Sequence, residues 1–211
     1  MKVAVSGEEF ILKPERVLYW RSRRILLVAD LHLGKIAHFR RSGIPVPTKV
    51  NEDNLSSLVD LINLTKPERL ICLGDLFHSH YNTAWEEFGE LVNHFSAVAF
   101  ELVIGNHDIM STLQYERKRI RVYDQLRIGN FLLTHHPLEC IGEDDYNLAG
   151  HIHPGVQMLG KGRQALTLPC FYFGKRQGIL PAFGGFTGIA RIKPQKDDHV
   201  YVIAEDKIIK V

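Results

Sequence analysis

Short apolar runs separated by amphipathic segments occupy the first half of the chain. The run at 25–29 is continuous and predicts a strand buried on both faces. The segments 69–75 and 97–108 begin with similar runs and predict two more strands. Two helices are expected between these strands, one capped by Thr48 and one starting near Thr83. Their inward positions are Leu55, Leu58, Val59 and Ile62, and then Trp85, Phe88, Val92 and Phe95.

The pattern changes in the second half, where short β-like pieces alternate with Gly and Pro turns. Residues 121–137 predict a hairpin that turns at Gly129 and Asn130. We therefore expect an α/β (α+β) fold in which two mixed β-sheets pack face to face and are flanked by helices. Because no repeat or linker is visible, a single domain over residues 1–211 is expected.

Composition is that of an ordinary soluble globular protein, with 45% hydrophobic and 24% charged residues. The net charge of +2 does not by itself indicate nucleic acid. Glu8 and Glu9 interrupt any secretory signal, and no apolar run approaches the roughly 20 residues of a membrane helix. Cys72, Cys140 and Cys170 are odd in number and far apart, so neither a disulfide framework nor a zinc site is expected. A cytoplasmic location and no membrane partner are the expectation.

Polar side chains follow five of the predicted strands, at the point where each strand ends. The motifs are Asp30-x-His32, Gly74-Asp75-x-x-His78, Gly105-Asn106-His107-Asp108, the pair His135-His136, and Gly150-His151-x-His153. The carboxyl ends of parallel strands are where α/β sheets bind ligands. Each motif alone could be a surface turn or a helix cap, but the five together, each behind an apolar strand, indicate one shared site.

The donor types in these motifs indicate a metal centre. Carboxylates, an amide oxygen and imidazoles suit Mn²⁺, Fe²⁺ or Zn²⁺ better than Ca²⁺, which prefers oxygen alone. The motifs offer more donors than one ion needs, and seven ligands with one bridging carboxylate fit two ions roughly 3.5–4 Å apart. Such a pair can hold a hydroxide at neutral pH and clamp a phosphoryl centre. We expect two divalent ions, Mn²⁺ first, with Fe, Zn or Mg as alternatives.

The ordered motifs from residue 30 to residue 153 resemble those of the calcineurin-like metallophosphoesterases. The resemblance implies a four-layer sandwich and a hydrolase that acts on phosphoesters by attack of a metal-bridging hydroxide. It implies that His107 protonates the leaving oxygen and that Asp108 orients His107. The implied metal ligands are Asp30, His32 and His153 for the first ion, Asn106, His135 and His151 for the second, and Asp75 for both.

The choice between His135 and His136 stays open, because adjacent residues of a strand point to opposite sides. His135 is favoured because it directly follows the apolar FLLT run, where the family places its ligand. The position of His136 is often Gly in relatives.

Longer segments, at 29–47, 74–79, 150–154 and 168–188, resemble the ligase-associated DNA-damage-response endonucleases. That resemblance implies a DNA-repair endo- or exonuclease and, as partners, DNA and DNA ligase or helicase repair proteins. The GDLFH string also resembles Mre-type DNA repair nucleases, where the histidine matching His78 helps to place the phosphate; a structural role for His78 is the alternative.

Basic residues beside the motifs bear on the substrate. Lys35, Arg40 and Arg41 follow the first motif, and a second run occupies 117–121. Such residues could bind a phosphodiester backbone or form solvated faces. The alternatives to a nuclease are a phosphodiesterase or pyrophosphatase for a small nucleotide or nucleotide-sugar, and a non-catalytic scaffold. Scaffold relatives typically lack ligands or the GNH histidine, whereas none is missing from this chain.

Overall fold

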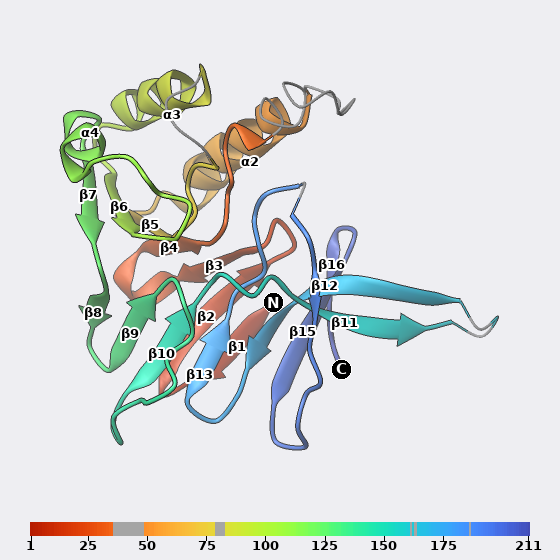
Figure 1. The fold of residues 1–211 in the computed structure, drawn as a ribbon. Coiled ribbons are helices and arrows are strands. Elements are labelled where there is room, and N and C mark those ends of the chain that lie inside the picture. The colour runs from red at the N-terminus through yellow and green to blue at the C-terminus, as the bar shows by residue number, and fades with distance from the viewer. Residues whose placement is uncertain (36–48, 79–82, 161, 163, 186) are drawn as a thin grey trace.

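The computed structural model of the protein describes residues 1–35, 49–78, 83–160, 162, 164–185 and 187–211, with the side chains of 49–53 outside this description. Within these residues the strands form two mixed sheets (Figure 1). The expected helix cap Thr48 lies outside the described residues.

The first sheet has seven described strands in the order of the chain. They are β1 (Lys2–Val5), β2 (Glu8–Lys13), β3 (Val17–Trp20), β4 (Ile25–Val28), β5 (Arg69–Leu73), β6 (Ala99–Val103) and β7 (Ile120–Tyr123). β1 to β4 pair antiparallel, and β4 to β7 pair in parallel. The three apolar runs of the sequence are thus neighbouring parallel strands, and their carboxyl ends meet at one edge.

The second sheet contains nine strands in the described part of the chain. They are β8 (Leu126–Ile128), β9 (Phe131–Thr134), β10 (Tyr146–Ala149), β11 (Pro154–Leu159), β12 (Ala165–Phe173), β13 (Gln177–Ile179), β14 (Ala190–Arg191), β15 (His199–Ala204) and β16 (Lys207–Lys210). The spatial order is β14-β11-β12-β13-β10-β9-β8, while β15 pairs with β12 and β16. β9 and β10 are parallel, so their carboxyl ends also lie together.

An apolar core between the sheets holds them face to face. Phe10 and Trp20 from the first sheet pack on Phe131 from the second, with ring centroids 4.9–5.4 Å apart. All three side chains are fully buried. Aromatic side chains bury large apolar areas, and this packing fixes how the two sets of strand ends face each other.

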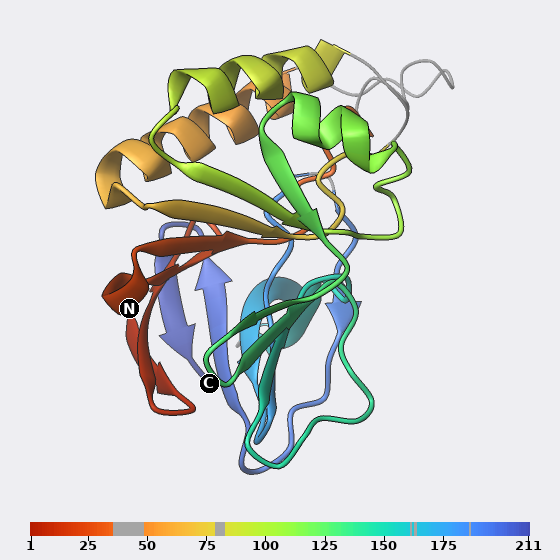
Figure 2. The same ribbon diagram turned by 90° about the vertical axis from the view of Figure 1, so that its left-hand side faces the viewer.

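The α-helices pack on one face of the first sheet (Figure 2). They are α2 (Lys49–Thr65), α3 (Thr83–His94) and the short α4 (Thr112–Arg117), and a 3-10 turn η1 spans Arg21–Arg23. Leu58 of α2, Trp85 of α3 and Tyr115 of α4 share one buried cluster with Leu26 and Cys72 of the sheet. None of the helices in the described ranges is long and apolar enough to cross a membrane.

Two mixed sheets packed face to face were expected, and this arrangement is confirmed. The structure differs from the expected four-layer sandwich in one respect. No α-helix of the described residues covers the outer face of the second sheet. The order of layers is helices, sheet, sheet. The physical reason is that the described residues between 126 and 211 form strands and turns without a helical apolar period.

The predicted hairpin over 121–137 is confirmed only in its second part. β8 and β9 pair antiparallel around Gly129, which has a positive φ of 61°. β7, expected to belong to the same hairpin, instead lies parallel to β6 in the first sheet. The chain crosses between the sheets at Asp124 and Gln125, a polar break that separates two short apolar stretches.

Candidate metal centre

The carboxyl ends of five strands converge on one site. β4 leads to Asp30 and His32, β5 to Asp75, and β6 to Asn106. The first two loops run side by side, because the Asp30 amide donates to the Gly74 carbonyl at 3.1 Å and the His32 amide to the Asp75 carbonyl at 2.9 Å. From the second sheet, β9 and β10 deliver His135, His151 and His153 to the same place.

The backbone at these positions adopts an unusual conformation. Five non-glycine residues of the motifs have φ between 49° and 65°, in the left-handed region that L-residues avoid. They are Asp30, His32, Asp75, His151 and His153. Strained backbone of this kind costs on the order of 1–3 kcal/mol per residue and is concentrated at functional sites. The packed strands hold these side chains in place against that cost.

Two glycines make the close approach of these side chains feasible. Gly74 has a φ of 81°, and a Cβ there would lie 2.1 Å from Nδ1 of His135. A Cβ on Gly105 would lie 2.3 Å from Oδ1 of Asp75. The motif glycines therefore leave room for the histidine and the carboxylate.

Asp30, His32 and His153 form the first group of donor atoms, which lie within 4.8 Å of one another. Oδ1 of Asp30 is buried and accepts no hydrogen bond from the described residues, whereas Oδ2 accepts one from the His151 amide at 2.9 Å. Nε2 of His153 lies 3.4 Å from Oδ1 of Asp30. On the other side of that ring, Nδ1 lies 3.1 Å from the Gly188 carbonyl. A histidine whose second nitrogen donates to a carbonyl presents a lone pair to a metal.

Burial controls the protonation of His32. It lowers the pKa of this imidazole to about 2, with smaller contributions from Lys35 and neighbouring histidines. His32 is therefore neutral at physiological pH. A neutral imidazole is the form that binds a metal.

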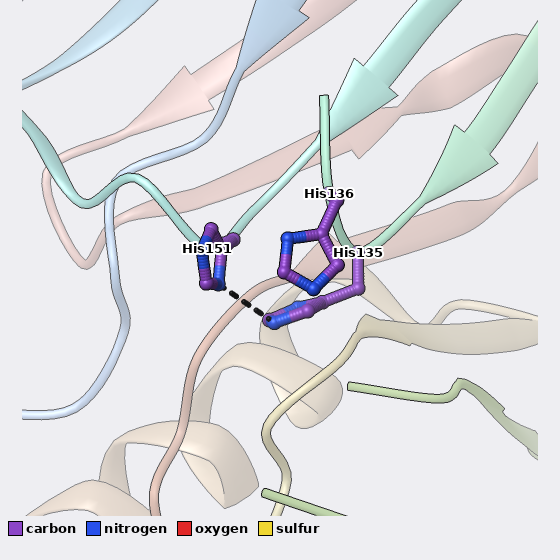
Figure 3. Close-up of side chains that lie close together, drawn as sticks. All are labelled: His135, His136 and His151. Atoms are coloured by element: carbon purple, nitrogen blue, oxygen red, sulfur yellow. Dashed lines mark hydrogen bonds between the residues drawn. The ribbon is translucent and has the colours of Figure 1, made fainter. Parts of the chain in front are cut away.

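His135, Asn106 and His151 form the second group. Nδ1 of His135 lies 2.9 Å from the Leu73 carbonyl and donates to it, so Nε2 is the acceptor nitrogen. That nitrogen lies 2.9 Å from Oδ1 of Asn106 and 3.1 Å from Nδ1 of His151. Figure 3 shows the His135 and His151 rings directed toward each other. The acceptor nitrogen of His135 thus faces the Asn106 oxygen and a His151 nitrogen, and a bound cation would stabilise this arrangement.

Asp75 connects the two groups. Its Oδ2 lies 3.7 Å from Nε2 of His32, in the first group, and its Oδ1 lies 3.5 Å from Nε2 of His135, in the second. The carboxylate is almost fully buried. Buried carboxylates without a cation are costly, so the residues present fit a pair of divalent ions.

The structure favours His135 over His136 as the ligand. His135 is buried between Asp30 and Asp75, whereas His136 is exposed. His136 nevertheless lies beside the second group, with its ring centroid 3.9 Å from that of His151 (Figure 3).

His107 and His78 lie together next to the first group. Their rings stack with centroids 4.9 Å apart, and each ring centroid lies within 5.6 Å of that of His32. The His107 amide donates to Oδ1 of Asp75 at 2.9 Å. Both predicted catalytic histidines are therefore brought to the centre from different strands.

The expected role of Asp108 needs correction. Its carboxylate accepts hydrogen bonds from the amides of Asp75, Leu76 and Phe77 at 2.8–3.3 Å, and from the Gly105 amide at 2.9 Å. The Tyr115 hydroxyl donates to it at 3.4 Å. Asp108 thus joins the loop after β5 to the loop after β6, rather than orienting the His107 ring. Burial raises the pKa of Asp108 to about 6, although these backbone donors act in the opposite direction.

Asp108→Ala is expected to lower the free energy of unfolding by at least about 3 kcal/mol, because each buried donor left unsatisfied costs about 1–3 kcal/mol. Urea denaturation of the metal-stripped protein measures this loss. Asp108→Asn retains one acceptor oxygen and should lose less. Equal stability of the Ala variant and the wild type would contradict the joining role.

The basic residues singled out in the sequence lie in different environments. Lys35 lies close enough to Asp75 and His32 to interact electrostatically with both. Arg40 and Arg41 lie outside the described residues. In the run at 117–121, Lys118 pairs with Glu86 and Arg119 donates to the Ser96 carbonyl at 3.0 Å. That run leads into the amino end of β7, which is the end of the strand opposite the metal centre.

Comparison with known proteins identifies the family. The sequence profile of the calcineurin-like phosphoesterase family matches residues 23–167, more than half of the chain. The chain belongs to this family. Its structure is similar to that of Pseudomonas putida nuclease MPE, with a TM-score of 0.84 and 28% sequence identity over 100% of this chain and 99% of that chain. The Escherichia coli phosphoesterase Yfce aligns with a TM-score of 0.44 and 13% identity over 89% of this chain and 97% of that chain. No curated protein matches the sequence.

Several contributions to this phosphoesterase site had no signal in the sequence. The carbonyls of Leu73 and Gly188 orient two histidines, and backbone acceptors are invisible to a motif. Tyr115, from the unpredicted α4, contacts Asp108. Tyr123, beside the centre on β7, carries no motif either.

Proposed function

We propose that this phosphoesterase hydrolyses phosphodiester bonds of DNA with the help of two divalent ions. The placement of the Asp75 carboxylate, with one oxygen toward each donor group, is the observation that supports this most strongly. Asp30, His32 and His153 would hold one ion, and Asn106, His135 and His151 the other. Bound there, the ions supply a nucleophile at neutral pH and offset charge on the phosphoryl oxygens. Mn²⁺ is the ion we propose first, on the mixed oxygen and nitrogen donor set.

The protein side chains have separate tasks in this proposal. His107 gives a proton to the leaving oxygen, and its amide bond to Asp75 keeps it next to the centre. His78 stacks on His107 and holds a phosphoryl oxygen. Lys35 contributes positive charge near Asp75. Together these groups orient the phosphate so that the ester oxygen faces His107.

DNA as the substrate is supported by the match to nuclease MPE, which spans nearly the full length of both chains. A role in DNA repair alongside ligase or helicase proteins, in the cytoplasm, is part of the same proposal. A small phosphodiester remains the second candidate, because the net charge is only +2 and Lys35 alone among the described basic side chains is assigned to the substrate.

A comparison of substrates on one Mn²⁺-loaded preparation tests the choice. Single-stranded DNA and nicked duplex are expected to be cleaved with higher kcat/KM than cyclic nucleotides or nucleotide-sugars. If three phosphates of a single strand are contacted, binding should weaken roughly 20-fold between 50 and 200 mM salt. Arg40→Ala/Arg41→Ala should reduce this salt dependence, while Arg127→Ala, an exposed residue paired with Asp145, should leave it intact. Faster turnover of a small phosphodiester would contradict the DNA proposal.

A further inference from the structure

A cavity of about 480 Å³ lies beside the second donor group, at the edge where the two sheets meet. Ile104, directly after β6, and Tyr123, at the end of β7, line it on one side, and His136 and Leu138 line it from the loop after β9. Asp124 and Gln125 line it from the connection that crosses between the sheets. Its volume is within the range of about 300–1,000 Å³ that is typical of sites for small organic groups.

The local fold explains why Tyr123 faces this cavity. Tyr123 is the last residue of β7, and its carbonyl accepts a hydrogen bond from the Ile104 amide at 2.9 Å. Ile120 and Val122 pack in the cluster beneath the helices. Because side chains alternate along a strand, Tyr123 points away from the helices and toward the second sheet.

His135 and His136 connect the cavity to the candidate metal centre. Both line the cavity, and a ring nitrogen of each lies within 4.8 Å of the other and of a ring nitrogen of His151. The ring centroid of His136 lies 4.7 Å from that of His135 and 3.9 Å from that of His151 (Figure 3). The cavity therefore adjoins the place where a phosphate would be held at the centre.

The chemistry of the lining indicates what that group is. The lining residues include no lysine or arginine, and Asp124 is an exposed carboxylate, so a second phosphate is disfavoured. Tyr123 and His136 offer aromatic faces, and Ile104 and Leu138 offer apolar contact. The Gln125 amide and the Asp124 carboxylate provide hydrogen-bonding groups for the edge of a flat, uncharged ring. Aromatic side chains with nearby polar groups are how proteins bind unstacked bases.

We propose that this cavity binds the nucleobase of a nucleotide adjacent to the scissile phosphate, with Tyr123 as its stacking partner. The proposal rests on the proposed phosphodiesterase function and adds a specificity determinant to it. It requires the base next to the cleaved bond to be unstacked, which favours single-stranded ends over intact duplex.

The test compares a nucleoside ester with an ester that has no base. The p-nitrophenyl ester of thymidine 5′-phosphate should be hydrolysed with higher kcat/KM than methyl p-nitrophenyl phosphate. Tyr123→Ala should reduce this preference by about 5- to 150-fold, the range measured for loss of stacking on one base, mainly through KM. Tyr123→Phe keeps the ring and should retain the preference. Tyr172→Ala, in the cluster on the outer face of the second sheet, is the matched control and should leave the preference unchanged.

Cross-linking separates this inference from the proposed function, because it requires no turnover. An oligonucleotide with one 5-iodouracil base should cross-link on irradiation to Tyr123 or His136 in the wild type, and Gln125→Ala should weaken this. Because it uses the wild-type protein, the cross-link also tests the base site if Tyr123→Ala does not fold. Equal kcat/KM for the two esters, or cross-links outside the cavity, would overturn the base site while leaving the phosphodiesterase proposal intact. If the protein cross-links to the base but hydrolyses neither ester, the result would instead contradict the phosphodiesterase proposal.

Discussion

Asp75→Asn is expected to reduce turnover of a phosphodiester at saturating Mn²⁺ by at least about 100-fold. Loss of a residue that only supports a metal ligand costs up to about 100-fold, and Asp75 is itself a proposed ligand. The amide has nearly the same shape as the carboxylate but lacks its negative charge and one of its two acceptor oxygens. In the native protein, one oxygen faces His32 and the other faces His135. The side chain of the variant can therefore bind the metal of only one donor group, and the pair of ions that would hold the phosphoryl oxygens is lost.

Hydrolysis of bis-p-nitrophenyl phosphate by the purified variant measures this loss. Asp145→Asn is a suitable control, because that carboxylate pairs with Arg127 near the amino end of β10, at the opposite end of the strand from His151. The control should retain full activity. Full activity of Asp75→Asn, or of metal-stripped wild-type protein, would contradict a mechanism that depends on two metals.

His107→Gln is expected to lower kcat for a DNA phosphodiester by about 10²- to 10⁴-fold, the usual contribution of a general acid. The loss should be smaller for a p-nitrophenyl ester, because p-nitrophenolate leaves without needing a proton. Metal content should stay unchanged, since the His107 ring stacks on His78 and belongs to neither donor group. kcat values for both substrates, with metal analysis of the same preparation, check all three points.

The matched control for His107 is His199→Gln, an exposed histidine at the start of β15. It should change neither kcat nor metal content. If His107→Gln loses metal, His107 is a ligand. Equal losses for the two esters would indicate that His107 binds the phosphate rather than protonating the leaving oxygen.

The parts of the site that follow apolar strands could be predicted from the sequence. Asp30, Asp75 and Asn106 come directly after runs whose hydrophobicity predicts buried parallel strands, and such strands bring their carboxyl ends together. The apolar run before it, together with the family resemblance, favours His135 over His136, and His135 is the buried member of the pair. Strand pattern and residue type therefore predict which strand ends meet, and the family resemblance adds the choice between the two histidines.

Other features depend on tertiary packing, which leaves no local pattern. Asp108 sits in a motif that predicts a partner for His107, yet its carboxylate accepts backbone amides of a neighbouring loop. β7 and β8 are separated by only two residues, and nothing local shows that they join different sheets. The cavity beside Tyr123 results from that crossing, so it too required the structure.

Electron paramagnetic resonance of the Mn²⁺-loaded protein, together with its metal content, tests the paired metal centre most directly. Two Mn²⁺ ions per chain with an exchange-coupled spectrum are predicted, since one carboxylate links neighbouring sites roughly 3.5–4 Å apart. The coupled signal should disappear in Asp75→Asn. A single Mn²⁺ per chain in the wild type, or two uncoupled ions, would contradict the bridging role of Asp75 and the two-metal centre.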